Sequence, residues 1–168
     1  MSKISLIFYW VFFAVLNLKA SEYEITVLAT NTANFGGIGE WSFSALLESD
    51  DEKVLFDTGF NENTVLHNAK LLGKDLSQVE KVILSHFHGD HTGGLIKLRK
   101  TFMEINPKAF STVYVAEGFF EQRYDQNGEL RGFIGGFNKV DNFLMETDKL
   151  GIKFIILEEP KEISKNLY

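Results

Sequence analysis

Residues 81–95, KVILSHFHGDHTGGL, combine a short apolar run with a dense cluster of polar side chains. The run at 82–84 is typical of a strand that is buried on both faces. Four side chains that can bind metal ions follow it within six residues: His86, His88, Asp90 and His91. Three of the four histidines of the protein therefore lie directly after one apolar run, and core packing gives no reason for such a cluster.

The geometry of an extended segment explains how these side chains can meet. Residues i and i+2 of a strand point the same way, so His86 and His88 can direct two imidazoles at one point. Gly89 allows a sharp turn that brings Asp90 and His91 back to the same space. Neutral imidazole and carboxylate groups suit zinc, iron or manganese. The sequence therefore predicts a metal site whose ligands are these three histidines and this aspartate.

A β-α-β unit is predicted to lead into this stretch. A strand is expected over 53–57, a helix over 63–72 that ends at Gly73, and a strand over 81–85. The two strands of such a unit are parallel, so both end at the same rim of the sheet. Asp57 and His86 should therefore be neighbours. His67 lies off the apolar stripe of the helix, and we expect it to be a surface residue rather than a ligand.

At residues 86–91 the chain resembles the metallo-β-lactamase superfamily, whose signature is H-x-H-x-D-H. Residues 54–59, VLFDTG, are similar to the strand of that family that ends in an acid before a glycine turn. Asn68-Ala69, Leu72-Gly73 and residues 85–95 resemble more narrowly the branch of dihydropterin-aminobenzene-phosphate synthase-like hydrolases. The resemblance implies an α/β fold, the αββα metallo-hydrolase sandwich, in which a mixed sheet is flanked by helices.

The resemblance also implies the chemistry of the site. In the family, His86 and His88 would help to hold one ion, and Asp90 and His91 a second. One or two zinc ions are expected, with iron or manganese as alternatives. Asp90 would also serve as a catalytic residue that accepts the proton of a metal-activated water. Asp57, which could otherwise be a turn-capping carboxylate, would support the site by orienting a histidine or a loop.

The sequence departs from the family pattern after His91, because none of the following 77 residues is a histidine. The later histidine ligands of the family are therefore absent. We expect residues 21–168 to correspond to the N-terminal half of the domain, as a fragment or as a truncated gene product. Two functions stay open: a metal-dependent hydrolase of small anionic or ester-like substrates, and a non-catalytic remnant or metal-binding module without turnover.

The rest of the chain is less informative about chemistry. Strands are predicted over residues 22–30, 41–47, 111–116 and 154–157, a glycine-rich loop over 31–40, and a helix over 92–100. Residues 117–136 allow two interpretations. They could form a wall over the substrate, with Arg123 or Arg131 meeting an anionic group. A surface loop pinned by its aromatic side chains is the more economical interpretation.

The composition and the N-terminal residues limit which partners and which cellular location can be expected. With 45% hydrophobic and 14% aromatic residues, the chain can bury one substantial core, and the absence of cysteine excludes disulfides and thiolate ligands. The net charge of −6 argues against a nucleic-acid surface, so a small-molecule substrate is expected. Residues 1–20 read as a signal peptide with cleavage after Ala20, although a retained anchor is an alternative. A periplasmic or secreted protein without stable membrane association after cleavage is expected; the oligomeric state stays open.

Overall fold

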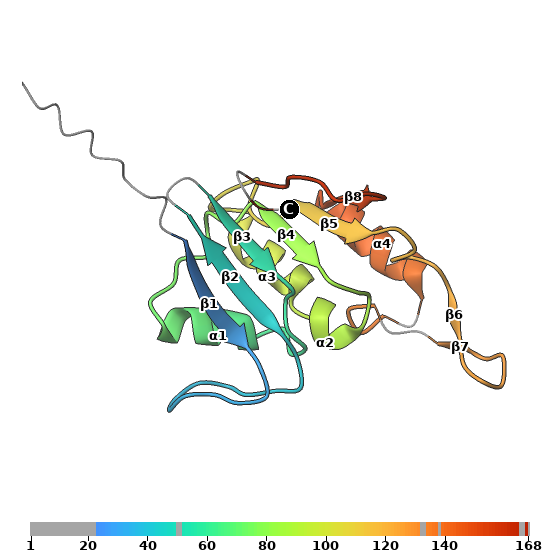
Figure 1. Cartoon of the computed structure of the whole chain (residues 1–168), viewed down its shortest axis with the longest axis horizontal. Coiled ribbons are helices and arrows are strands. Elements are labelled where there is room, and N and C mark those ends of the chain that lie inside the picture. Colours follow the sequence, from blue (N-terminus) through green and yellow to red (C-terminus); the bar gives the residue numbers. More distant parts are fainter. Residues whose placement is uncertain (1–22, 50–51, 132–133, 138, 165–166, 168) are drawn as a thin grey trace, which may run out of the picture.

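The computed structural model of the protein describes residues 23–49, 52–131, 134–137, 139–164 and 167. Residues 1–20, for which a signal peptide is predicted, lie outside the described residues. The described chain forms one mixed sheet with helices packed on one face, which confirms the predicted α/β class (Figure 1). Among the helices described, none is long and apolar enough to cross a membrane.

Within the described residues the main sheet has six strands in the order β1-β2-β3-β4-β5-β8. Their bounds are Glu24–Ala29 for β1, Ser44–Glu48 for β2, Lys53–Phe56 for β3, Lys81–Leu84 for β4, Thr112–Ala116 for β5 and Lys153–Leu157 for β8. The pairs β1-β2 and β2-β3 are antiparallel, whereas β3, β4, β5 and β8 are mutually parallel. The carboxyl ends of these four parallel strands therefore lie along one edge, here named the carboxyl rim.

Short helices and one hairpin fill the connections between the strands. The helices are α1 (Thr64–Leu71), α2 (Gly89–Thr92), α3 (Leu95–Phe102) and α4 (Val140–Lys149), and β6 (Arg123–Tyr124) pairs with β7 (Leu130–Arg131). The unit β3-α1-β4 has the predicted parallel strands, and Gly73 takes the predicted place after α1 with φ +68°. His67 is exposed as expected, and its Nε2 lies 2.7 Å from the carbonyl oxygen of Gly36.

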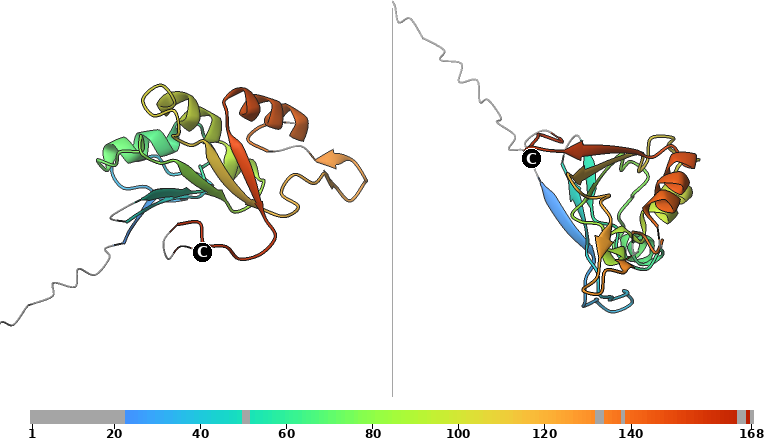
Figure 2. Two further views of the ribbon diagram at one scale, coloured as in Figure 1. Left: turned by 90° about the horizontal axis from the view of Figure 1, so that it is seen from above. Right: turned by 90° about the vertical axis from the view of Figure 1, so that its right-hand side faces the viewer.

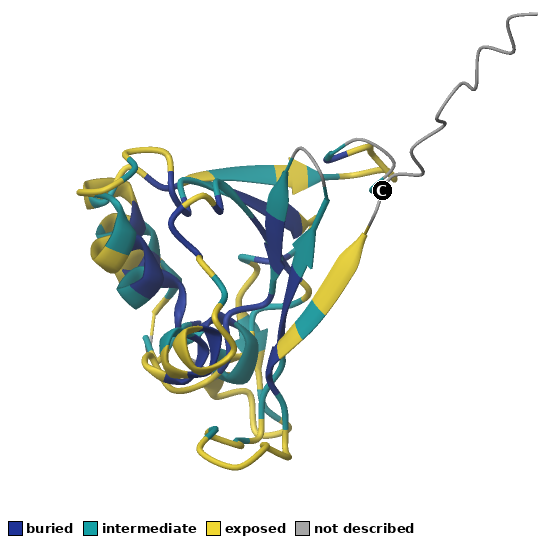
Figure 3. Ribbon diagram, turned by 90° about the vertical axis from the view of Figure 1, so that its left-hand side faces the viewer, coloured by how far each residue is buried: buried dark blue, intermediate teal, exposed yellow. Residues whose placement is uncertain are grey.

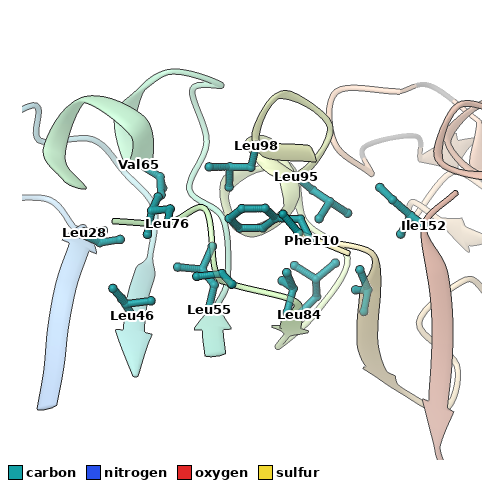
Figure 4. Close-up of a cluster of buried hydrophobic side chains, with 14 of the residues drawn as sticks. Leu28, Leu46, Leu55, Val65, Leu76, Leu84, Leu95, Leu98, Phe110 and Ile152 are labelled. Atoms are coloured by element: carbon teal, nitrogen blue, oxygen red, sulfur yellow. The ribbon is translucent and has the colours of Figure 1, made fainter. Parts of the chain in front are cut away.

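The core lies between the sheet and the layer formed by α1, α3 and α4, which cover one face (Figure 2). Leucine side chains of the strands meet apolar side chains of the helices there (Figure 4). The labelled members of this cluster are Leu28, Leu46, Leu55, Val65, Leu76, Leu84, Leu95, Leu98, Phe110 and Ile152. Burial of each large apolar side chain contributes roughly 1.5–3 kcal/mol. This packing fixes β3 and β4, and therefore the carboxyl rim.

The opposite face of the sheet is only partly covered. Tyr23, Ile25 and Val27 share one side of the strand segment, as predicted, but they are 52%, 68% and 46% exposed (Figure 3). The chain after β8 runs back below this face, where Ile163 is buried and its carbonyl oxygen accepts a hydrogen bond from Lys81 Nζ at 2.9 Å (Figure 2). The alternation of β1 therefore predicted a shared face correctly, although that face is not the core.

Two predicted element boundaries were wrong, and the first has a local cause. The helix predicted over 92–100 is divided, because Gly93 and Gly94 separate α2 from α3. A Cβ atom at Gly93 would collide with the carbonyl oxygen of Phe60, and one at Gly94 with that of Thr58. The two glycines thus let the turn after β3 pack directly on the backbone. The strand predicted over 41–47 begins only at Ser44.

The region after residue 117 has more regular structure than predicted. No helix was predicted over residues 140–149, yet α4 lies there with Phe143 fully buried. The apolar residues Val140, Phe143 and Leu144 do have helical spacing, so the signal was present in the sequence. The segment 117–136 contains the β6-β7 hairpin, which was not predicted either.

Candidate metal centre

The predicted ligands lie on one loop at the carboxyl rim, directly after β4. This ligand loop comprises residues 85–91, and α2 begins within it. The turn after β3 holds it on one side. The backbone N–H of Asp57 donates to the carbonyl oxygen of Ile83 at 2.8 Å, and the backbone N–H of Thr58 donates to that of His91 at 2.7 Å. The hydroxyl of Thr58 donates to the same His91 oxygen at 3.0 Å. The turn after β3 therefore holds the end of β4, which leads into the ligand loop, and the last residue of the loop.

Asp57 is the buried centre of the hydrogen bonds below the ligand loop. Its side chain accepts from the backbone N–H of Ser85 at 2.8 Å, from the Ser85 hydroxyl at 2.7 Å and from Nδ1 of His91 at 2.7 Å. Asp57 is 1% exposed and has a φ of +53°. Such a backbone conformation is uncommon outside glycine and is found preferentially at functional sites. The structure thus places Asp57 against His91 and Ser85 rather than directly against His86.

The contact with Asp57 fixes the tautomer of His91. A carboxylate only accepts hydrogen bonds, so Nδ1 of His91 carries the proton that Asp57 accepts. The lone pair of a neutral His91 then lies on Nε2, which faces Asp90 with an Nε2–Oδ2 distance of 3.6 Å. Carboxylates orient metal-binding histidines in this way in many metal sites.

The four predicted ligands come together at the rim. Ligand atoms of His86, Asp90 and His91 all lie within 4.8 Å of one another. His88 adjoins this group through His86, because its Nδ1 lies 3.1 Å from Nε2 of His86. Two nitrogens that bind one tetrahedral zinc at about 2.0–2.1 Å are roughly 3.3 Å apart, so this separation suits a shared ion. The rings of His86 and His91 are also close, with centroids 4.2 Å apart.

Electrostatics favour the neutral form of His86. Burial is the main cause that lowers its pKa, and the nearby His91 and His88 rings lower it further, while Asp57 and Asp90 act in the opposite direction. The Ser85 hydroxyl lies 3.0 Å from Nδ1 of His86, on the side of the ring away from His88. His86 is therefore ready to offer Nε2 as a neutral ligand at neutral pH.

Three supporting residues were not predicted from the sequence: Ser85, Thr58 and Thr92. The hydroxyl of Thr92 donates to the carbonyl oxygen of His88 at 3.0 Å and accepts from the backbone N–H of Gly135 at 2.8 Å. Ser85 and Thr92 immediately flank the segment 86–91, so their hydroxyl groups were the available signal. Their partners Asp57 and Gly135 are distant in sequence, and only the fold brings them near.

The donor set fits a borderline divalent cation. It combines imidazole nitrogens with one partly exposed carboxylate, and the chain has no cysteine that could add a thiolate. This chemistry suits zinc, with iron or manganese also compatible. The Asp57 carboxylate behind His91 supplies the outer-layer partner that such ligands usually have.

An α/β sheet with a histidine- and aspartate-rich loop at the carboxyl end of a parallel strand defines a class of metal-dependent proteins. Residues 42–160 match the metallo-beta-lactamase superfamily, and the chain belongs to that superfamily. An uncharacterized protein of Methanocaldococcus jannaschii is 30% identical over 143 residues, which cover 85% of this chain and 50% of the relative. The 7,8-dihydropterin-6-methyl-4-(beta-D-ribofuranosyl)-aminobenzene-5'-phosphate synthase of the same organism is 27% identical over 157 residues, covering 89% and 50%.

Solved structures show the same fold. Tm1679, a metal-dependent hydrolase of the beta-lactamase superfamily, is 28% identical with a TM-score of 0.56 over 86% of this chain and 46% of that chain. The short form of human tRNase Z is 19% identical with a TM-score of 0.50, over 79% and 42% of the two chains, and shows the fold alone. This chain spans about half the length of the curated relatives that it matches.

Proposed function

We propose that this chain carries the metal centre of a hydrolase that acts on a small anionic or ester-like substrate. The observation that supports this most strongly is the convergence of His86, Asp90 and His91, with His88 3.1 Å from His86, above a buried Asp57. Structural ion pairs do not need two imidazoles and a carboxylate at one point with a third imidazole beside them. Membership of the superfamily, which includes metal-dependent hydrolases such as Tm1679, supports the same function.

We assign the ligand roles to His86, His88, Asp90 and His91, for one or two zinc ions or for iron or manganese. A bound ion of this kind would lower the pKa of a coordinated water and polarise an ester or phosphoryl oxygen. Asp57 keeps the His91 ring in one orientation and one tautomer. Asp90, whose carboxylate faces His91, can act both as a ligand and as the group that receives a proton from the attacking water.

A small-molecule substrate, rather than a nucleic acid, is part of the proposal. The net charge of −6 supports it, since nucleic-acid surfaces gather cations. The name of the M. jannaschii synthase includes a 5'-phosphate, which is compatible with an anionic substrate. We further propose export, on the basis of residues 1–20. The mature protein from its own host should begin at Ser21, and cytoplasmic protein that retains Met1 would contradict export.

The proposed function is tested by metal content and turnover. The purified protein is loaded with zinc, iron or manganese, the bound metal is measured by mass spectrometry, and phosphodiester, thioester and carboxylic ester substrates are assayed. Bound metal with turnover that disappears on chelation and returns with metal would support a hydrolase. Bound metal with no turnover of any substrate would instead support the metal-binding module. No bound metal would contradict both.

A further inference from the structure

The segment 117–137 adjoins the ligand loop and is attached to the fold at both of its ends. At its beginning, Phe119 is 5% exposed and packs edge-on against Phe120, whose ring packs edge-on against Phe154 with centroids 5.0 Å apart. At its end, Ile134 is 3% exposed and the next backbone N–H, of Gly135, donates to Thr92 beside the ligand loop. The aromatic anchoring predicted for this segment is therefore present.

The middle of the segment is held by its own hydrogen bonds. The N–H of Asp125 donates to the carbonyl oxygen of Glu129 at 2.9 Å. The Asp125 carboxylate accepts from the backbone N–H groups of Asn127 at 2.8 Å and Glu129 at 2.9 Å. This turn fixes the register in which Arg123 of β6 stands opposite Arg131 of β7. The position of Arg123 is therefore set by a closed hairpin.

Arg123 lies over the ligand loop. Its Cζ is 5.1 Å from the centroid of the Phe87 ring, and that ring lies 4.7 Å from the ring of His88 and 6.3 Å from that of His86. The Phe87 ring thus lies beside the ring of His88 and carries the guanidinium on its face. A hydrogen bond from Nη2 of Arg123 to the carbonyl oxygen of Gly118, at 3.0 Å, further orients the guanidinium.

The side-chain partner of Arg123 can be exchanged for a ligand. Nη1 donates to the Glu121 carboxylate at 3.2 Å, and the Glu121 side chain is 72% exposed. Exposed ion pairs of this kind contribute little to stability because water screens them. In the part of the chain that the structure describes, two of the five guanidinium N–H groups meet acceptors. An incoming anion can therefore replace Glu121 without loss of a buried contact.

We propose that Arg123 binds an anionic oxygen group, phosphoryl or carboxylate, of the substrate that reacts at the candidate metal centre. The proposal rests on the proposed function and names the part of the substrate that is recognised. The planar guanidinium matches two oxygens of either group through paired hydrogen bonds. Phe87 holds the guanidinium near His88, so the anionic group would lie beside the reacting bond. Arg123 is then a specificity-determining residue and has no part in metal binding.

The test follows anion binding at Arg123 independently of turnover. Phenylphosphonate, benzoate and the neutral benzyl alcohol are titrated into the metal-free and the zinc-loaded protein and followed by NMR. The Nε–H signal of Arg123 is followed in the wild type, and the backbone amide signals of the ligand loop give the affinity in every protein. The variants are Arg123→Gln, which removes the charge, and Arg123→Lys, which keeps the charge without the planar fork. Lys149→Gln is the matched control. It removes an exposed cation at the end of α4, shortly before β8 begins, and the beginning of β8 lies at the end of the strands opposite the carboxyl rim.

We expect phenylphosphonate or benzoate to shift the Arg123 signal and benzyl alcohol to leave it unchanged. The anion that binds more tightly indicates whether the substrate carries a phosphoryl or a carboxylate group. Arg123→Gln should weaken that binding about tenfold, Arg123→Lys less, and Lys149→Gln not at all, with equal zinc content in all proteins. Equal anion affinity in wild type and Arg123→Gln, or no anion binding by wild type, would overturn the proposal. If zinc is not bound at all, the proposed function fails, while the metal-free titration still decides whether Arg123 binds anions.

Discussion

The two ends of the parallel strands carry opposite kinds of polar cluster. At the amino ends of β3 and β4, lysines and glutamates pair closely, as in Lys74–Glu48 at 2.6 Å, Lys53–Glu48 at 2.9 Å and Lys81–Glu52 at 2.7 Å. At the carboxyl rim, nitrogen faces nitrogen, with His86 Nε2 and His88 Nδ1 3.1 Å apart. With Glu24, which pairs with Lys74 at 2.7 Å, the first cluster has three lysines and three glutamates and neutralises its own charges. The second gathers ligand atoms that could hold a metal ion around one point.

This difference separates a structural end of the sheet from a chemical end. The paired charges fasten β2, β3 and β4 to one another and to the loop after α1, and they need nothing from solution. The histidines of the rim are held in place by Asp57 and Ser85 beneath them, which leaves their outer nitrogens directed at a common space. Substitutions at the two ends should therefore change different properties of the protein, and four predictions follow this division.

The largest effect is expected from His86→Ala. Removal of this imidazole takes a ligand from the centre of the cluster, so zinc affinity should fall by more than about 100-fold, since loss of an outer-layer partner alone weakens binding about 10- to 100-fold. Far-ultraviolet circular dichroism should stay unchanged, because His86 is only partly buried. His67→Ala is the matched control, since His67 contacts Gly36 on the α1 side. Equal zinc affinity in both variants would refute the ligand assignment.

A smaller effect on the same property is expected from Asp57→Asn. Asparagine also tolerates the left-handed backbone at φ +53°, so the turn should be retained. The variant loses the charge that fixes His91, and zinc affinity should fall about 10- to 100-fold. Titration against a competing chelator measures the change, and Asp75→Asn, at a capping carboxylate away from the rim, serves as control. Unchanged affinity in Asp57→Asn would show that the carboxylate is only a turn cap.

The sequence predicted the local parts of this site and missed the distant ones. The alternation of His86 and His88, and the turn at Gly89, depend on neighbouring residues and are visible in any single sequence. The proximity of Asp57 followed from the parallel β-α-β rule. The bond between Thr92 and Gly135 joins residues 43 positions apart that are separated by α3, β5 and the β6-β7 hairpin, and no such rule relates them.

The same distinction applies to the fold. The strands with continuous apolar runs or alternation were predicted to within a few residues, because burial on a sheet leaves a period-two pattern. The helix break at Gly93 depends on the close approach of Phe60, and a glycine pattern alone does not reveal what approaches it. Helix α4 was missed because it follows a glycine-rich stretch and buries the polar Thr147, whose hydroxyl donates to the Phe143 carbonyl oxygen.

At the other end of the sheet, Glu48→Gln should change stability and leave zinc binding intact. The variant breaks the charge pairs with Lys74 and Lys53, whose side chains share a partly exposed site. The free energy of unfolding should fall by about 1 kcal/mol or less, because solvent screens such pairs. Urea denaturation measures it, and the exposed Glu104→Gln should have no effect. A loss of zinc affinity in Glu48→Gln would show that the two ends are coupled.

The smallest effect is expected in the pH dependence of the difference in unfolding free energy between wild type and Glu48→Gln. Burial raises the pKa of the Glu48 carboxyl, but the hydrogen bonds and charges of Lys74 and Lys53 outweigh burial and hold the pKa below its ordinary value of 4.5. The folded state therefore binds a proton at Glu48 less readily than the unfolded chain does. Its stabilising contribution is complete above about pH 4.5 and is lost as the pH falls through the lowered folded pKa. The stability gap between wild type and Glu48→Gln should thus be constant from pH 7 to pH 5 and should narrow below pH 4.5, as measured by urea denaturation at each pH with Glu104→Gln alongside. A gap that widens in acid would mean that the Glu48 pairs oppose folding.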